Sequence, residues 1–91
     1  MNTQTEFEYI GDQKMQESNC IGIAFTRPTG SNPVSINGYP LEDGQTLKIE
    51  QNVGDIDRTQ YSVIFTQSGI KTNECYCFRT LPLGQFQKDS L

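Results

Sequence analysis

The chain has 91 residues, a net charge of −4 at pH 7, and neither histidine nor tryptophan. Its 7 basic residues are scattered singly, so the sequence lacks the clustered basic footprint of a nucleic-acid-binding protein. No run of about 18 apolar residues predicts a membrane-spanning helix, and the first residues lack the basic and apolar regions of a signal peptide. We therefore expect a protein made in a cytosol, with no nucleic-acid partner and no membrane partner.

Apolar side chains make up 34% of the residues, so the sequence supports one domain with a small core. Domains of this size bury only about two-thirds of the surface that the unfolded chain exposes. Such domains often gain stability from disulfides, a metal or a partner. The cysteine count of 3 leaves one unpaired, and a zinc site would lack histidine ligands. By elimination, burial against another chain is the favoured source of additional stability.

Residues 1–19 are polar apart from Phe7, Tyr9 and Ile10. The alternation around these residues predicts a short strand. The segment 13–19 allows one helical turn, but it has too few apolar anchors for a longer helix. We expect residues 1–19 to form an N-terminal arm outside the β domain, which spans residues 20–80.

The β domain begins with a strand over residues 20–25. Its bulky apolar residues fall on one face, and the small residues Cys20, Gly22 and Ala24 fall on the other, where another backbone or sheet could approach closely. Further strands with alternating patterns are expected over residues 46–50, 61–66 and 74–79. The predicted core residues are Ile21, Ile23, Phe25, Val34, Ile36, Leu47, Ile49, Tyr61, Val63 and Phe65.

A hairpin is predicted at Asn37–Gly38, because this dipeptide suits a type I′ turn, which needs positive φ at both central residues. Pro40 in the returning segment cannot donate to a ladder, which confines that segment to an edge or to a very short pairing. We therefore predict one small antiparallel β-sandwich or barrel of about five to seven strands. A C-terminal tail, residues 81–91, follows it without a clear hydrophobic period.

The side chains of the three cysteines are expected to pack in the hydrophobic core. Cys75 and Cys77 lie on one face of a predicted strand, but side chains at i and i+2 are about 6–7 Å apart, too far for an easy disulfide. Cys20 could reach one of them from a neighbouring strand, which leaves a disulfide and a soft-metal site as alternatives. Free cysteines usually pack as small hydrophobic residues, so we expect three reduced, buried thiols.

The acidic residues near Gly54 do not form a recognised calcium loop. Glu50, Asp55 and Asp57 lack the further ligands of an EF-hand, and aspartates in turns commonly bond local backbone amides. A histidine base for nucleophilic catalysis is absent, and a chain this small leaves little room for a glycosidase cleft. We expect a protein that is not an enzyme, with no catalytic residue, no cofactor and no metal site.

The stretch 32–65 carries a resemblance to a known group of proteins. Its pattern N-P-V-x-I-N-G-x-x-L-x-x-G-x-x-x-x-I, then G-x-I-D-x-T-x-Y-x-x-x-F, resembles short β-rich virion proteins of tailed bacteriophages that infect Bacteroidetes, including the crAss-like group. The resemblance covers about a third of the chain and implies a protein that decorates or reinforces a capsid or a head–tail junction. The residues that carry it are Asn32, Pro33, Val34, Ile36, Asn37, Gly38, Leu41, Gly44, Ile49, Gly54, Ile56, Asp57, Thr59, Tyr61 and Phe65.

Two functions are considered. The first is a virion structural protein, present as a homo-oligomer or bound to a lattice of major capsid or other virion proteins. The second is a cellular β-sandwich adaptor or carbohydrate-binding module. A binding module should expose clustered aromatic side chains, yet the aromatic residues mostly favour the core, and Tyr39 alone is expected to stand out. The residues expected to contact partners are Phe7, Tyr9, Ile10, Tyr39, Leu81, Leu83, Phe86 and Leu91, so that deleting residues 1–12 or 82–91 should abolish assembly but not folding.

Overall fold

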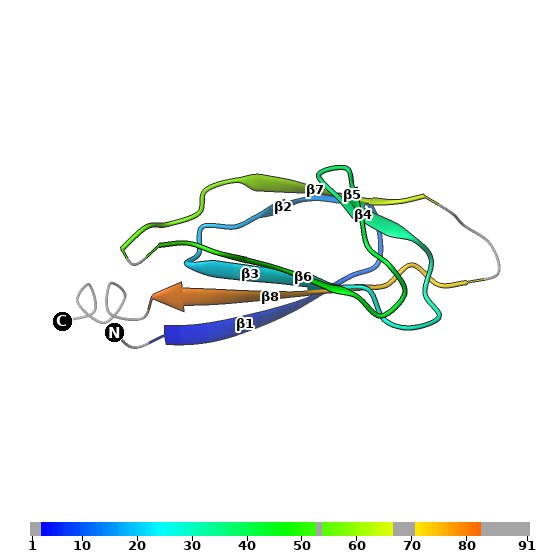
Figure 1. Ribbon diagram of the computed structural model, residues 1–91, viewed down its shortest axis with the longest axis horizontal. Helices are drawn as coiled ribbons and strands as arrows, with labels where there is room; N and C mark the ends of the chain where they lie inside the picture. The colour runs from blue at the N-terminus through cyan, green and yellow to red at the C-terminus, as the bar shows by residue number, and fades with distance from the viewer. Residues whose placement is uncertain (1–2, 53, 67–70, 83–91) are drawn as a thin grey trace.

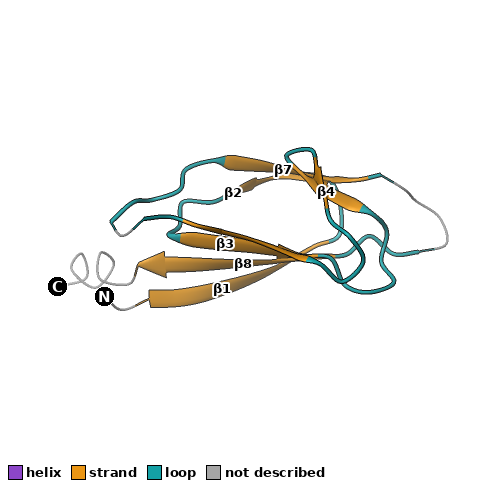
Figure 2. Cartoon of the chain, viewed as in Figure 1, coloured by secondary structure: helices purple, strands orange, loops and turns teal. Residues whose placement is uncertain are grey.

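A computed structural model describes residues 3–52, 54–66 and 71–82. These residues form two antiparallel four-stranded sheets that lie one above the other (Figures 1 and 2), which confirms the all-β expectation. Sheet A has the order β1 (Thr3–Ile10), β8 (Cys75–Pro82), β3 (Gly22–Thr26) and β6 (Thr46–Glu50). Sheet B has the order β2 (Lys14–Glu17), β7 (Gln60–Phe65), β4 (Val34–Ile36) and β5 (Tyr39–Pro40). The described ranges contain no helix, and therefore none that could cross a membrane.

The chain changes sheet at every connection except the β4–β5 hairpin. Strands that pair are therefore distant in sequence, as when β1 pairs with β8 over eight residues, from Thr3 opposite Pro82 to Ile10 opposite Cys75. The strand number, eight in the described residues, exceeds the five to seven expected. The additional strand is β2, in the segment for which the sequence allowed a helical turn.

The core lies between the sheets and is built from the inward-facing residues of both. Of the ten predicted core residues, seven are buried in it, and Leu47 and Ile49 pack against it from the edge strand β6. Ile21 differs, because it precedes β3, donates its amide to the Thr80 carbonyl and remains half-buried. The core also contains Ile10, Leu41 and the three cysteines.

The hairpin at Asn37–Gly38 has the predicted geometry. Asn37 has φ of 50° and Gly38 has φ of 84°, as the type I′ turn requires. The turn also extends the pairing of β4 with β7. The Asn37 amide donates to the Ser62 carbonyl at 2.9 Å, and the Ser62 amide donates to Asn37 Oδ1 at 2.7 Å.

The expected N-terminal arm is corrected by the structure over residues 3–17. Residues 3–10 form the edge strand of sheet A, residues 14–17 form the edge strand of sheet B, and Ile10 is 2% exposed in the core. Deleting residues 1–12 would therefore remove part of sheet A and a core side chain. We therefore expect this deletion to destabilise the sandwich, in contrast to the sequence-based expectation that the sandwich stays folded.

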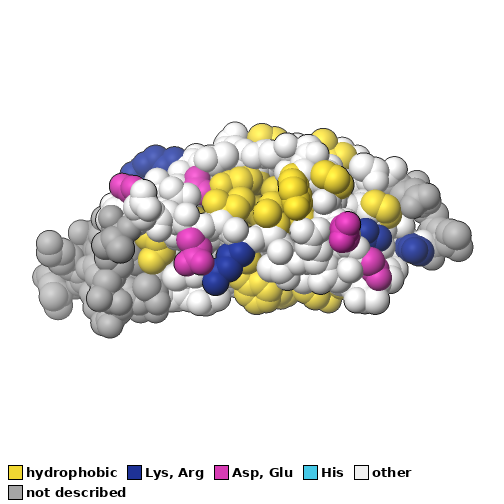
Figure 3. Space-filling view, viewed as in Figure 1, with side chains coloured by type: hydrophobic (Ala, Val, Ile, Leu, Met, Phe, Trp, Pro, Cys, Tyr) yellow, Lys and Arg dark blue, Asp and Glu magenta, His cyan; other side chains and the backbone are white. Residues whose placement is uncertain are grey.

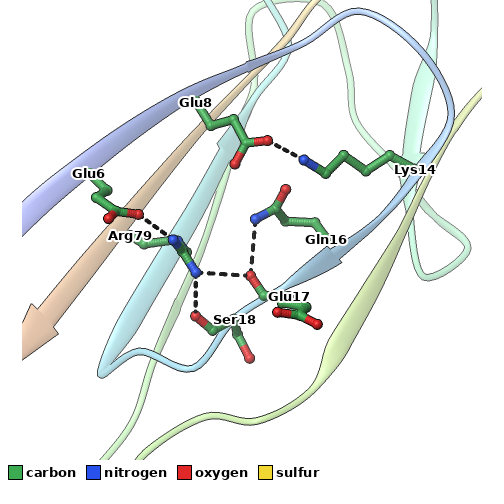
Figure 4. A network of polar contacts seen from close by, with 7 residues as sticks. All are labelled: Glu6, Glu8, Lys14, Gln16, Glu17, Ser18 and Arg79. Atoms are coloured by element: carbon green, nitrogen blue, oxygen red, sulfur yellow. Dashed lines mark hydrogen bonds and ion pairs between the residues drawn. The ribbon is translucent and has the colours of Figure 1, made fainter.

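Polar side chains of β1, β2 and β8 contact one another along the edge of the sandwich where β1 and β2 lie (Figure 4). Arg79 pairs with Glu6 and donates to the Ser18 carbonyl at 2.9 Å, and Lys14 pairs with Glu8. The glutamates thus lie on the inner side of β1, whose aromatic residues point the other way. Gln16 lies in the same layer, 3% exposed, and its Oε1 has no hydrogen-bond donor among the described residues.

Candidate functional site: the outer face of sheet A

The outer face of sheet A exposes four aromatic side chains on two neighbouring strands. We call Phe7 and Tyr9 of β1 with Tyr76 and Phe78 of β8 the aromatic ledge. Phe7 lies opposite Phe78 and Tyr9 opposite Tyr76 in the ladder. Phe7, Tyr9 and Phe78 are 56%, 52% and 38% exposed. Figure 3 shows hydrophobic side chains at the surface along the lower side of the view, where sheet A lies.

The rings of the ledge contact one another but are not coplanar. The Phe7 ring centroid lies 5.0 Å from that of Phe78 and 5.6 Å from that of Tyr76, and the Tyr9 and Tyr76 centroids are 6.1 Å apart. The ring planes are inclined by 46–53°, and the centroid distances lie within the range of about 4.5–7 Å that is usual for aromatic pairs. The Tyr9 hydroxyl donates to the Asn73 carbonyl at 3.3 Å, which fixes one end of the ledge. The ledge is therefore a ridged apolar surface.

Beside the ledge the sheet surface drops to the smallest side chains of the chain. On β3, Ala24 lies opposite Phe78 of β8, and Gly22 lies opposite Thr80 of β8. We call Gly22 and Ala24 the trough. A groove of about 470 Å³ runs over the trough, with the Phe78 ring on one side. The other groove-lining residues include Lys48, Glu50, Gln51 and Asn52.

The fold does not require glycine at position 22. Positive φ occurs at Gly30, Gly38, Gly44 and Gly54 but not at Gly22. A Cβ atom at Gly22 would meet its nearest neighbours, Glu50 Cγ and the Ile49 carbonyl oxygen, at 3.8 Å, an ordinary contact. Glycine inside a strand costs about 0.5–1 kcal/mol relative to alanine, and it often marks a place where a ligand or another backbone approaches. The trough thus has an open floor that internal packing does not explain.

The charged side chains of this face lie on one border. Lys48 and Glu50 on β6 form an exposed ion pair at 3.3 Å. The other residues that alternate outward on sheet A are threonines, aromatic residues and the two trough residues. The face is therefore neutral on a chain whose net charge is −4.

The residues predicted to contact partners separate into several environments. Phe7 and Tyr9 belong to the ledge and are exposed, although the sequence predicted that Tyr39 alone would stand out among the aromatic residues. Ile10 is buried in the core, so its predicted partner contact is wrong, and Leu81 packs against the core from β8. Tyr39 is 50% exposed but lies on β5 in sheet B, away from the ledge. Leu83, Phe86 and Leu91 lie outside the described residues.

The sequence did not predict Tyr76 and Phe78 as contact residues, because its aromatic residues were expected mostly to favour the core. The available signal was the alternation of β8. Cys75 and Cys77 are buried, at 0% and 1% exposure, and residues between two inward-facing positions must point outward.

The cysteine thiols, which lie outside this face, are buried in the core and contribute to folding. The three cysteines are free and buried, and burial raises the pKa of Cys75 to about 11 and of Cys77 to about 12. Burial and the nearby Asp57 carboxylate likewise raise the pKa of Cys20. No group of three or more potential metal ligands occurs in the described part of the chain.

Asp57 serves the turn that the sequence suggested for it. Its carboxylate accepts the Thr59 amide at 2.8 Å and the Tyr61 hydroxyl at 2.6 Å. Burial acts to raise the pKa of the Asp57 carboxyl, but these hydrogen bonds outweigh burial and hold it below its usual value. The Ser18 hydroxyl donates to the Asp57 carbonyl at 2.8 Å and so joins this loop to β2. The motif D-x-T-x-Y is thus explained by folding.

In comparisons with known proteins, no family model, no curated protein and no solved structure matches the chain.

Proposed function

We propose that this chain is a non-enzymatic structural protein of a bacteriophage virion, which attaches to a neighbouring protein through the outer face of sheet A. The observation that carries the attachment is the aromatic ledge beside an open trough. The resemblance of residues 32–65 to virion proteins supplies the setting, in which the protein reinforces a repeated lattice of capsid or head–tail proteins. In that setting the chain is made in the bacterial cytoplasm and acts in the particle.

The ledge has the composition of a protein-binding surface. Aromatic residues are enriched at the centres of protein interfaces, where a few buried anchors dominate the binding energy. Fully burying such a side chain contributes about 1.5–3 kcal/mol. Since Phe7 and Tyr9 are half exposed and Phe78 somewhat less, covering them offers roughly 1 kcal/mol each. The isolated domain does not obtain this burial free energy, because the rings stay exposed to water.

The groove suits contact better than catalysis. The ionisable side chains that line it are Lys48 and Glu50, which pair with each other. Their side chains are 69% and 67% exposed, whereas catalytic acids and bases usually depend on burial to tune their pKa. The groove therefore supports docking of a partner surface.

A glycan-binding module is the second candidate, because the polar residues Lys48, Gln51 and Asn52 share a groove with the aromatic Phe78. Sugar rings stack parallel to an aromatic face, so a platform for several sugars needs coplanar rings. The inclination of 46–53° between neighbouring rings of the ledge favours protein contact over such a platform. Titration with xylo- and manno-oligosaccharides, followed by NMR of the backbone amides, separates the two: saturable shifts over β3 and β8 would establish the glycan module.

The test of the proposed function is co-sedimentation with particles that lack this component. The variant Phe7→Ser/Phe78→Ser removes two rings of the ledge, and Ile64→Ser is the matched control, since Ile64 is 41% exposed on the outer side of sheet B. We expect the wild type and the control to bind at a fixed copy number and the ledge variant to lose occupancy. Equal occupancy for all three would overturn attachment through sheet A.

A further inference from the structure

We infer that the neighbour on the outer face of sheet A is a second copy of this chain, packed face to face about a two-fold axis parallel to the strands. The axis would pass between β8 and β3. This inference rests on the proposed function, because it names the partner of the same face. A two-fold interface requires a surface that complements itself, and three properties of this face meet that requirement.

The first property is shape. The outward residues form rows across the four strands, and one row reads Phe7, Phe78, Ala24 and Lys48. A two-fold axis between β8 and β3 reverses this order in the second copy. Phe78 of each copy then lies over Ala24 of the other, so that the ledge fills the trough. The same operation places Thr80 over Gly22, where the missing side chain admits it.

The second property is charge. Two copies with a net charge of −4 repel each other, and the outer face of sheet A is locally neutral. In the proposed arrangement Lys48 of one copy lies over the Phe7 ring of the other, where a cation can interact with the ring face. Glu50 lies opposite Thr5. No like charges are brought together.

The third property concerns the β1 edge of sheet A, where the charges of β1 disfavour pairing with the β1 strand of a second copy. Strand β1 is the edge of sheet A next to the ledge, and antiparallel pairing of two β1 strands would join the sheets edge to edge. If two β1 strands paired antiparallel about residue 6, 7 or 8, then Glu6 or Glu8 of one copy would lie directly opposite a glutamate of the other copy. Like charges directly opposite are destabilising, and inward-pointing charges are a known means of blocking edge pairing. Pairing of two copies through the β1 edge is therefore disfavoured.

The size of the face limits such a dimer to weak affinity. Four strands about 4.8 Å apart and five residues long at about 3.3 Å each give a planar footprint of roughly 300 Å². Stable interfaces bury about 800 Å² on each partner. We expect copies to associate measurably at high concentration and fully where a lattice holds them close together.

Sedimentation equilibrium of the purified chain tests the inference. We expect a monomer–dimer equilibrium that Phe78→Ser weakens by at least about tenfold, as for an interface anchor. Ala24→Phe, which fills the trough but leaves the ledge intact, should weaken it similarly, and Ile64→Ser should leave it unchanged. Circular dichroism spectra of all variants should match the wild type, so that a folding defect is detected separately.

Cross-linking tests the axis. Thr5 and Glu50 lie in one row on opposite strands of sheet A, three strand spacings or about 14 Å apart. The proposed axis brings Thr5 of one copy over Glu50 of the other. A mixture of Thr5→Cys and Glu50→Cys proteins should therefore cross-link with a short bismaleimide, and neither variant alone should do so. The native thiols are buried and do not compete.

A wild type that stays monomeric at about 1 mM, near the weakest specific affinities, and a mixture that does not cross-link would overturn the inference. If particle binding still depended on Phe7 and Phe78, the neighbour would be a different virion protein, and the proposed function would stand. A dimer that forms while the ledge variant binds particles normally would support the second copy and overturn attachment to the particle through this face.

Discussion

Removing the Tyr61 hydroxyl should destabilise the fold strongly, although the change deletes a single oxygen. The Tyr61 hydroxyl donates to Asp57 Oδ2 at 2.6 Å, and the two residues are only 7% and 5% exposed. Hydrogen bonds to a charged group contribute about 1.5–3 kcal/mol, and a buried acceptor left without its donor costs a similar amount. We expect Tyr61→Phe to lower the free energy of unfolding by about 2–3 kcal/mol at pH 7.

Urea denaturation followed by circular dichroism measures this loss. The slope m should stay constant, because the surface exposed on unfolding is unchanged. Tyr39→Phe is the matched control, since Tyr39 is 50% exposed and its hydroxyl accepts only a 3.3 Å bond from Gln45. We expect the control to change stability by less than about 0.5 kcal/mol. A Tyr61→Phe variant within that same margin would refute the role given to the Asp57 hydrogen bond.

The pH dependence provides an independent check on the same pair. The folded-state pKa of Asp57 is lowered, so its contribution is present above the unfolded pKa of about 3.9 and is lost as pH falls through the folded value. The difference between wild type and Tyr61→Phe should therefore shrink at low pH. Burial first, and then Asp57, raises the pKa of Tyr61 to about 12. Between pH 10 and about 12 the wild type should lose more stability than Tyr61→Phe. Both proteins share the loss that comes from the buried thiols of Cys75 and Cys77, whose pKa values are also raised.

Three further changes test other parts of the fold. Gly38→Val should cost about 1–3 kcal/mol by forcing a β-branched residue to positive φ, and an unchanged melting temperature would contradict the turn; Gly22→Ala, in ordinary strand geometry, is the control. The three cysteines should react with Ellman's reagent only after denaturation, and a count of one thiol would reveal a disulfide. Gln16→Leu removes a buried amide oxygen without a donor, but also the 3.0 Å bond from Gln16 Nε2 to the Glu17 carbonyl. An unsatisfied buried group costs about 1–3 kcal/mol and a neutral hydrogen bond contributes about 0.5–1.5 kcal/mol, so we expect a net stabilisation of about 1 kcal/mol; destabilisation in urea would contradict this balance.

The sequence predicted the elements better than their pairing. Alternation located the strands around Phe25, Ile49 and Val63, and the Asn37–Gly38 dipeptide located the hairpin, because both signals are local. The pairing of β1 with β8 joins residues more than 60 positions apart, and no local pattern encodes it. For that reason the segment before residue 20 was interpreted as an arm, although it supplies an edge strand to each sheet.

The phase of β1 was the hardest feature to predict. In the run Glu6–Tyr9 an alternating pattern shows that the segment is a strand, and apolar residues would ordinarily face the core. The structure has the opposite phase, with the glutamates inside. The inner side of β8 explains it: Arg79 follows Cys75 and Cys77 in the inward alternation, and it requires a carboxylate partner.

This inverted phase is the strongest argument that the aromatic ledge has a role outside the domain. A chain with only 34% apolar residues would gain most from placing Phe7 and Tyr9 between the sheets. Instead Glu6 and Glu8 occupy the inner side of β1, where they pair with Arg79 and Lys14 and remain 43% and 41% exposed, and both rings are left about half exposed. Ion pairs whose side chains are exposed to this degree contribute little stability, so replacing the aromatic rings by glutamates on the inner side of β1 does not favour folding. It favours a neutral, ridged aromatic surface beside an open trough, which is the form that a protein partner can cover.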